Sequence, residues 1–326
     1  WIRGAQKVRY NYLVCLKRNN AESLSIDMSL VSIVQQPKLP YISKTLEELA
    51  QMQKSANEDT KSPAILPQSD QQDFDAILSG TFSFEPEMPS EILEDWNSVI
   101  TTWRESKETP LNMQRLLKYG IPSHLRKHVW LLIVGLSNGP IISQAEYSKL
   151  VSTESQYEKV IKRDTNRTFT CHEFFKKADG EGQKSLYSVC KAYSNYDKAV
   201  GYCQGLSFIV ANFLLHFDEI HSFSLLVQVM YKIGHRAMFG QSFEELQCFL
   251  YVFKRLIFIN LPELAKHFND IGLEPQMFGP QWFLTLFTSK FPLGMVDQAL
   301  DMYLSQGERS LLQISIAMLT ICCNDI

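Results

Sequence analysis

The sequence has no large excess of charge of either sign. Its 32 lysine and arginine residues nearly balance 35 aspartate and glutamate residues, which leaves a formal net charge of −3 over 326 residues. A protein that binds nucleic acid through its overall charge would carry a basic excess, so the balance argues against that class. It also argues against a polyacidic disordered chain, because 45% of the residues are hydrophobic and can form one large or two smaller cores.

Cysteine pairs at metal-binding spacing are also missing. The seven cysteines are scattered, odd in number and form no C-x-x-C motif. This usage is typical of a reducing compartment, where free thiols act as small apolar side chains. The pattern therefore argues against a zinc site.

No segment has the roughly 18–20 predominantly apolar residues that a membrane span requires. The uncharged stretch 199–217 is interrupted by four polar side chains, those of Gln204, Ser207, Asn212 and His216. The first residues, beginning with Trp1, show no secretory signal pattern. We expect the sequence to be a piece of a longer protein.

The composition changes twice along the chain. Residues 1–52 include two stretches with strand character, 10–16 and 24–30, which predict a partial β-containing upstream region. Residues 53–90 begin with polar residues and prolines, which predict a flexible, disordered linker. Over 91–326 apolar residues recur at helical spacing almost continuously, which predicts an all-α domain of about ten or more helices.

Individual helices are marked by apolar stripes at the spacing of one helix face. The clearest stripes lie at 125–136, 186–193, 206–217 and 246–257. The stretch 206–217 is apolar on most sides, so we expect it at the centre of the domain. Pro122 precedes the first stripe, where proline suits the first helical turn.

Three candidate chemical sites are weak. His124 and His128 share a helix face, but the glutamate of a metalloprotease helix and a third ligand are missing. Cys203 is more simply a packed or near-surface thiol than a nucleophile. Gly180 and Gly182 lack the Gly-x-x-x-x-Gly-Lys-Ser/Thr phosphate-loop motif and a preceding strand, so a plain helix–helix loop is the better interpretation.

Two polar segments stand out within the apolar helical pattern, at 161–169 and 201–205. In the first, Asp164 can orient Arg167 three residues later on one helix face. In the second, Gln204 lies between two glycines just before the apolar helix. An arginine and an amide are what phosphoryl transfer to water requires, since one neutralises charge and the other orients the water. Taken singly, Arg167 is explained as well by an ordinary ion pair, and Gln204 by a helix cap.

Together the two segments resemble the paired signature of the TBC domain of Rab GTPase-activating proteins. The I-x-x-D-x-x-R motif is matched by Ile161, Asp164 and Arg167. The Y-x-Q-G motif is matched by Tyr202, Gln204 and Gly205. Two further elements, which we interpret as structural, are similar to the family's G-[IV]-P-x-x-x-R-x-x-V-W and W-F…F…P patterns and contain Gly120, Pro122, Arg126, Trp130, Trp282 and Pro292.

The resemblance implies a multi-helix TBC-type domain over 91–326 that supplies two residues in trans to a GTP-bound Rab. Arg167 would stabilise charge on the γ-phosphate, and Gln204 would position the attacking water. Asp164 and Tyr202 would hold these two residues, while Gly205 would permit close backbone approach. Arg126 would anchor its helix through an ion pair or hydrogen bond. Mg²⁺ and GTP would belong to the Rab, so the chain itself would need no cofactor and no metal.

The same resemblance leaves one alternative of another class open, a catalytically silent scaffold that binds a Rab. Such domains usually lack the arginine or the glutamine, and this sequence has both, which favours GTPase activation. A helical-repeat domain would need self-similar units, and the sequence shows none.

Segments 185–208 and 281–293 are similar to the subfamily of Rab GTPase-activating protein 1 and its close relatives. That similarity implies a cytoplasmic regulator of vesicle trafficking and intracellular protein transport, associated with the Golgi, endosomes or centrosome. Two departures are visible: Thr170 replaces a frequent proline, and only Asp301 and Gly307 remain of an R-x-W-D…E-G pattern. We expect these differences to affect packing rather than catalysis, and we expect the domain to be cut short at its C-terminal end.

Overall fold

The computed structural model describes residues 88–106, 110, 112–240 and 242–323. Within these residues the regular structure is entirely helical and contains no strand, as the apolar periodicity predicts. The all-α class is therefore confirmed. The segments expected to be β-containing and the predicted linker up to residue 87 lie outside the described residues.

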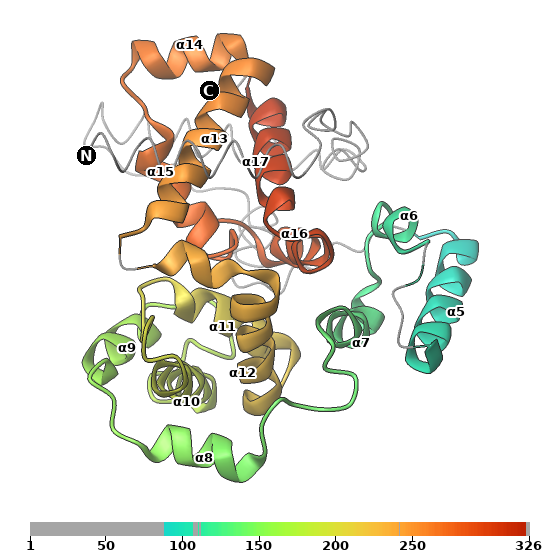
Figure 1. Cartoon of the computed structure of the whole chain (residues 1–326), viewed down its shortest axis with the longest axis vertical. Coiled ribbons are helices and arrows are strands. Elements are labelled where there is room, and N and C mark those ends of the chain that lie inside the picture. Colours follow the sequence, from blue (N-terminus) through green and yellow to red (C-terminus); the bar gives the residue numbers. More distant parts are fainter. Residues whose placement is uncertain (1–87, 107–109, 111, 241, 324–326) are drawn as a thin grey trace, which may run out of the picture.

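The helices are joined by connections of different length, the longest of which spans residues 166–180 (Figure 1). The first five are α5 (Ser90–Ser106), α6 (Met113–Leu117), α7 (Ser123–Val134), α8 (Gln144–Ser152) and α9 (Glu158–Thr165). The middle group consists of α10 (Glu181–Tyr196), α11 (Leu206–His216), α12 (Glu219–Gln228), the π-helix η2 (Val229–Ile233) and the 3₁₀ helix η3 (His235–Phe239). The last group consists of α13 (Glu244–Asn260), α14 (Pro262–Asp270), α15 (Pro275–Leu284), α16 (Leu293–Gln306) and α17 (Glu308–Cys322).

The predicted helix at 125–136 begins and ends at recognisable signals. Pro122 is the N-cap of α7. Proline is tolerated there because the helix needs no backbone N–H hydrogen bond from this position. Gly135 ends the helix with φ of 81°, a left-handed conformation that glycine adopts without steric cost. Leu136 therefore lies beyond the helix, although it is buried and still packs in the core.

Helix α10 is the hub of one half of the domain. It packs against α8, α9, α11 and α12, and Figure 1 shows it surrounded by these elements. Helix α11 is buried along most of its length, in agreement with the apolar run 206–217. This half carries both polar segments singled out in the sequence.

Helix α13 has the equivalent position in the other half, where it packs against α14, α15 and α17. Trp282 of α15 lies in an aromatic cluster in this half. Its ring contacts those of Phe253, Phe278, Phe287 and Phe291, with centroid separations of 5.1 to 6.2 Å. Pro292 is the N-cap of α16, so both residues of the W-F…F…P element serve packing and helix initiation.

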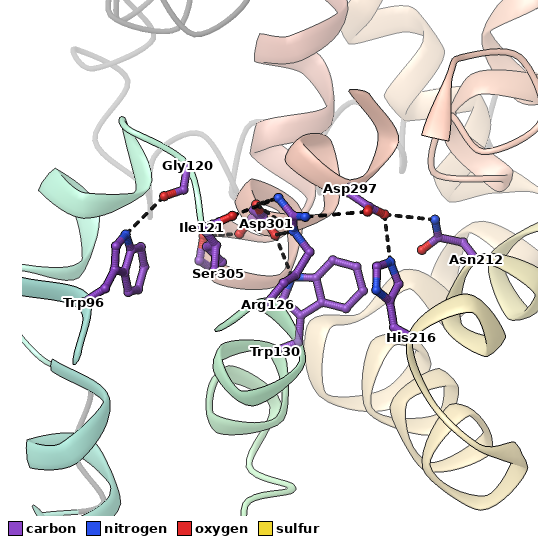
Figure 2. A network of polar contacts seen from close by, with 10 residues as sticks. All are labelled: Trp96, Gly120, Ile121, Arg126, Trp130, Asn212, His216, Asp297, Asp301 and Ser305. Carbon is purple, nitrogen blue, oxygen red and sulfur yellow. Dashed lines mark hydrogen bonds and ion pairs between the residues drawn. The ribbon is translucent and has the colours of Figure 1, made fainter. Parts of the chain in front are cut away.

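A buried ion pair joins α7 to α16 (Figure 2). Arg126 Nε donates to Asp301 Oδ1 at 3.1 Å, and Arg126 Nη2 donates to Asp301 Oδ2 at 3.2 Å. Trp130 Nε1 donates to Asp301 Oδ1 at 2.7 Å. The Asp301 side chain is only 2% exposed, so these donors replace the water that the carboxylate has lost. Arg126 also donates to the carbonyl of Ile121 at 2.9 Å, which fixes the chain entering α7.

The network extends to α11 and to α5. Asp297, one turn before Asp301, accepts hydrogen bonds from Asn212 and His216 of α11, each at 3.1 Å. At the other end, Trp96 Nε1 donates to the carbonyl of Gly120 at 3.1 Å. Elements far apart in the sequence are thus joined through polar contacts in the core (Figure 2).

Among the described helices, none combines the length and the apolar character needed to cross a bilayer.

Candidate functional site

Asp164 is the buried centre of the candidate site. It lies in the last turn of α9 and its side chain has no exposed surface. Arg167 Nε donates to Asp164 Oδ1 at 2.9 Å, and the Tyr202 hydroxyl donates to Asp164 Oδ2 at 3.0 Å. One carboxylate therefore binds a residue from each of the two polar segments.

The sequence predicted that Arg167 shares a helix face with Asp164. In the structure Arg167 instead lies beyond the end of the helix that carries Asp164. Helix α9 ends at Thr165, and the N–H of Arg167 bonds to the carbonyl of Asp164 at 3.2 Å in a tighter turn. Two residues later Phe169 adopts a positive φ of 48°, which stops any helical continuation. The i,i+3 ion pair survives because the tight turn keeps the two side chains adjacent.

The guanidinium of Arg167 is presented to solvent. Its side chain is 46% exposed while the partner carboxylate is fully buried. Only its Nε has a hydrogen bond among the described residues, so the two terminal nitrogens keep donors available. An arginine held in this way can bind an anion with the outer face of its fork.

Gln204 is exposed and lies two residues before the first residue of helix α11, Leu206. The N-cap of α11 is Gly205, so Gln204 is not the cap. Gly205 has a φ of 112°, and a Cβ there would lie 3.2 Å from Thr285 Cγ2. A side chain at this position would be strained, so the glycine keeps the backbone beside Gln204 tightly packed.

A second hydrogen bond joins the two segments. Thr168 Oγ1 and Ser207 Oγ are 2.9 Å apart and both side chains are buried. Arg167 lies between Asp164 and Thr168 in the chain, and Gln204 lies between Tyr202 and Ser207. The Tyr202–Asp164 and Thr168–Ser207 hydrogen bonds therefore join the two segments on either side of Arg167 and Gln204.

Thr168 and Ser207 were not predicted as site residues from the sequence. The available signal was spacing: Thr168 is four residues after Asp164 and can reach its carbonyl, as it does at 2.7 Å. Ser207 gave no comparable signal, because its partner is 39 residues away.

Burial shapes the chemistry of two side chains here. It raises the pKa of the Tyr202 phenol well above its usual range, so the hydroxyl stays protonated and can donate to Asp164. It also raises the pKa of the Cys203 thiol, which disfavours the thiolate that a cysteine nucleophile needs. Cys203 is half-buried, consistent with the interpretation as a packed thiol.

Packing fixes the remaining members of the two motifs. Ile161 lies in α9 and is completely buried. Gly201 has a φ of 62°, and a Cβ there would lie only 2.3 Å from the ring of Tyr157. Tyr157 is the N-cap of α9, so the first residue of the second segment lies against the start of the helix that carries the first.

The rejected candidates form no competing site. His124 and His128 are both exposed on α7. Gly180 ends the connection between α9 and α10 as the N-cap of α10. Gly182, in contrast, lies inside α10, where a Cβ would be 2.1 Å from the Phe174 carbonyl oxygen. No three histidine, cysteine or acidic side chains gather as a metal-binding group within the described part of the chain.

Comparison with known proteins yields consistent matches. The family model described as "Rab-GTPase-TBC domain" matches residues 123–326. The chain is 39% identical to Rab GTPase-activating protein tbc-11 of Caenorhabditis elegans over 303 residues, which cover 89% of this chain and 32% of that protein. It is 34% identical over 256 residues to the Ecotropic viral integration site 5 ortholog of Drosophila melanogaster, with coverage of 76% and 31%.

A solved structure shares the fold. The crystal structure of the Chlamydomonas flagellar RabGAP TBC domain aligns with a TM-score of 0.61 and 27% identity, covering 72% of this chain and 81% of that one. The chain spans about a third of the length of the curated relatives it matches.

Proposed function

Because this chain belongs to the Rab-GTPase-TBC domain family, we propose that it accelerates GTP hydrolysis by a Rab-family small GTPase. One observation carries the proposal. Two exposed side chains, those of Arg167 and Gln204, emerge from segments that are joined by buried hydrogen bonds. A charged fork and a neutral amide on one rigid support are the groups that GTP hydrolysis requires.

Arg167 would act on the phosphate of the bound GTP. Its terminal nitrogens would bind the γ-phosphate and stabilise the charge that develops on the β–γ bridging oxygen. An arginine finger contributes about 10³–10⁵ in rate to GTPases, or about 4–7 kcal/mol. Asp164 holds the guanidinium by its Nε, which lowers the entropic cost of presenting the other two nitrogens.

Gln204 would orient the attacking water, taking the place of the GTPase's own glutamine. Its backbone is fixed on one side by Tyr202 and on the other by Gly205. Mg²⁺ and GTP would be held by the Rab, and the chain would supply only Arg167 and Gln204. We expect the TBC-type domain to occupy 91–326, with the upstream region 1–52 and the linker 53–90 preceding it.

The finer assignments rest on resemblance alone. We propose membership of the subfamily of Rab GTPase-activating protein 1 on the basis of segments 185–208 and 281–293. On that basis the protein would regulate vesicle trafficking and act in the cytoplasm on GTP-bound Rab proteins at Golgi or endosomal membranes or near the centrosome. The C. elegans relative named above is itself called a Rab GTPase-activating protein.

The test is single-turnover GTP hydrolysis by a panel of purified Rab proteins, with the parent chain and with Arg167→Ala and Gln204→Ala. Matched controls are Arg104→Ala and Gln144→Ala, which remove exposed residues of the same types on α5 and α8. Circular dichroism establishes that all variants are folded. We expect the parent to accelerate at least one Rab and both site variants to lose about 10³-fold or more, with the controls unchanged.

The same experiment distinguishes GTPase activation from the alternative function, a catalytically silent scaffold. A scaffold would bind a GTP-loaded Rab without accelerating hydrolysis, and neither site substitution would change the hydrolysis rate. That result would overturn the proposed function.

A further inference from the structure

A buried carboxylate at the end of α10 organises the loop that leads to Gln204. Asp197 is the C-cap of α10 and its side chain is only 2% exposed. Arg236 donates two hydrogen bonds to this carboxylate, from Nε to Oδ2 at 2.6 Å and from Nη2 to Oδ1 at 3.0 Å. The Tyr193 hydroxyl donates to the same carboxylate at 3.1 Å.

The carboxylate also accepts hydrogen bonds from the loop itself. The backbone N–H groups of Ala199 and Val200 each donate to Asp197 Oδ1 at 3.2 Å, and the N–H of Gly201 donates to the Asp197 carbonyl at 2.6 Å. Burial raises the pKa of Asp197, but the hydrogen bonds from Arg236 and the loop outweigh it and lower that pKa to about 2. Asp197 is therefore ionised at neutral pH, and its charge is satisfied by groups that fold the loop.

Arg236 reaches this carboxylate from a distant element. It lies in η3, 39 residues further along the chain, and its guanidinium stacks over the ring of Tyr231 at 5.2 Å from the centroid. A planar fork that stacks and binds both carboxylate oxygens is a feature of arginine that lysine does not reproduce. The arrangement therefore fixes the direction of the Asp197 carboxylate as well as its charge.

The loop is short and leaves Gln204 little freedom once its first half is fixed. Two residues separate the last N–H bound to Asp197, that of Gly201, from Gln204. Gly201 lies against Tyr157, and Tyr202 bonds to Asp164. The Asp197–Arg236 ion pair therefore fixes the start of segment 197–204, and the Gln204 amide lies at the end of this segment.

We propose that Arg236 is a positioning residue for Gln204, acting through Asp197 and the loop that follows it. The inference rests on the proposed function, since it assigns Arg236 to the support of one of the two residues supplied to the Rab. Without Arg236 the buried carboxylate loses its two strongest donors, so the loop would rearrange to bring water to it. A displacement of about 1 Å at a catalytic group can cost about 100-fold in rate.

The test combines single-turnover hydrolysis with a double-mutant cycle. Arg236→Ala is expected to lower the maximal rate at saturating chain concentration about 10–100-fold, while the half-saturating concentration stays within about twofold. In a Gln204→Ala background the same substitution should cause no further loss. In an Arg167→Ala background it should lower the residual acceleration again. Equal losses in both backgrounds, or no loss in the parent, would overturn the proposal.

A second measurement does not depend on GTPase activity. Hydrogen–deuterium exchange of peptides spanning 197–206 should become at least tenfold faster in Arg236→Ala, while peptides from α13 stay unchanged. Arg236→Lys keeps the positive charge but cannot donate from two nitrogens to both carboxylate oxygens, so it should show intermediate exchange. This lysine variant still tests the proposal if the alanine variant does not fold. The matched control is Arg115→Ala, whose ion pair with Asp95 is exposed.

The two measurements separate the two claims. If the parent accelerates no Rab, the proposed function fails, and the exchange experiment alone decides whether Arg236 holds the Gln204 segment. If exchange in 197–206 is unchanged by both Arg236 substitutions, the positioning role is refuted whatever the hydrolysis rates.

Discussion

Replacing Arg126 by alanine should destabilise the fold far more than removing an ordinary ion pair. The side chain is 11% exposed and binds Asp301 with two nitrogens, while Asp297 lies 3.7 Å from its Nη1. The substitution leaves the Asp301 carboxylate buried, with Trp130 as its side-chain donor. It also removes the donor to the Ile121 carbonyl.

The expected magnitude follows from this burial. Breaking a buried pair by removing one partner costs about 3–5 kcal/mol, because the remaining charge is left uncompensated. An exposed pair of the same chemistry, Arg115 with Asp95, contributes about 0–1 kcal/mol. Burial already raises the pKa of Asp301 to about 6 against the opposing effect of Arg126, and that pKa will rise further in the variant. Protonation should therefore relieve the defect in acid.

Urea unfolding followed by tryptophan fluorescence and far-ultraviolet circular dichroism measures this effect. We expect Arg126→Ala to lower the free energy of unfolding by about 3–5 kcal/mol at pH 8 and by less at pH 5, with Arg115→Ala within about 1 kcal/mol of the parent at both. A loss below about 1 kcal/mol at pH 8, equal to that of the control, would show that the buried Arg126–Asp301 pair contributes no more than an exposed pair.

Three further substitutions test other parts of the structure by the same unfolding assay. Tyr202→Phe removes a donor from a buried carboxylate and should cost about 1–3 kcal/mol; no loss would mean that the bond is not formed. Gly182→Ala places a Cβ 2.1 Å from the Phe174 carbonyl oxygen and should cost at least about 1–3 kcal/mol, whereas Gly240→Ala, with its nearest neighbour at 3.5 Å, should be nearly neutral; equal effects would contradict this. Burial raises the pKa of Glu308 from 4.5 to about 7, so the stability it gives is present below pH 4.5 and lost as pH rises through 7. Glu308→Gln should thus gain about 1–3 kcal/mol on the parent between pH 5 and pH 8, and a pH-independent difference would refute the assignment.

The helices were predictable because each has a strong local signal. The stripes at 186–193 and 246–257 fall inside α10 and α13, and the apolar run 206–217 became the buried α11. Boundaries were less predictable, since they depend on backbone conformation. Leu136 continues the stripe of α7 but follows the left-handed Gly135, and Arg167 keeps helical spacing but follows the end of α9.

The two motif segments could be identified from the sequence, but not the contacts that support them. Ser207 and Arg236 each bind a partner 39 residues away, and no periodic pattern links such positions. The arginine and tryptophan of the family's R-x-W-D pattern are absent beside Asp301, and from this we predicted altered packing in that region. The structure shows that the retained aspartate accepts hydrogen bonds from Arg126 and Trp130, which lie more than 170 residues earlier in the chain.

In the proposed function this chain supplies both an arginine and a glutamine to the Rab. The most direct test measures single-turnover hydrolysis by a responsive Rab whose own catalytic glutamine has been replaced by alanine. If Gln204 orients the attacking water, the parent chain should still accelerate this Rab to a similar degree, and Gln204→Ala should not. Acceleration that disappears with the Rab's own glutamine, yet survives in Gln204→Ala, would contradict this role of Gln204.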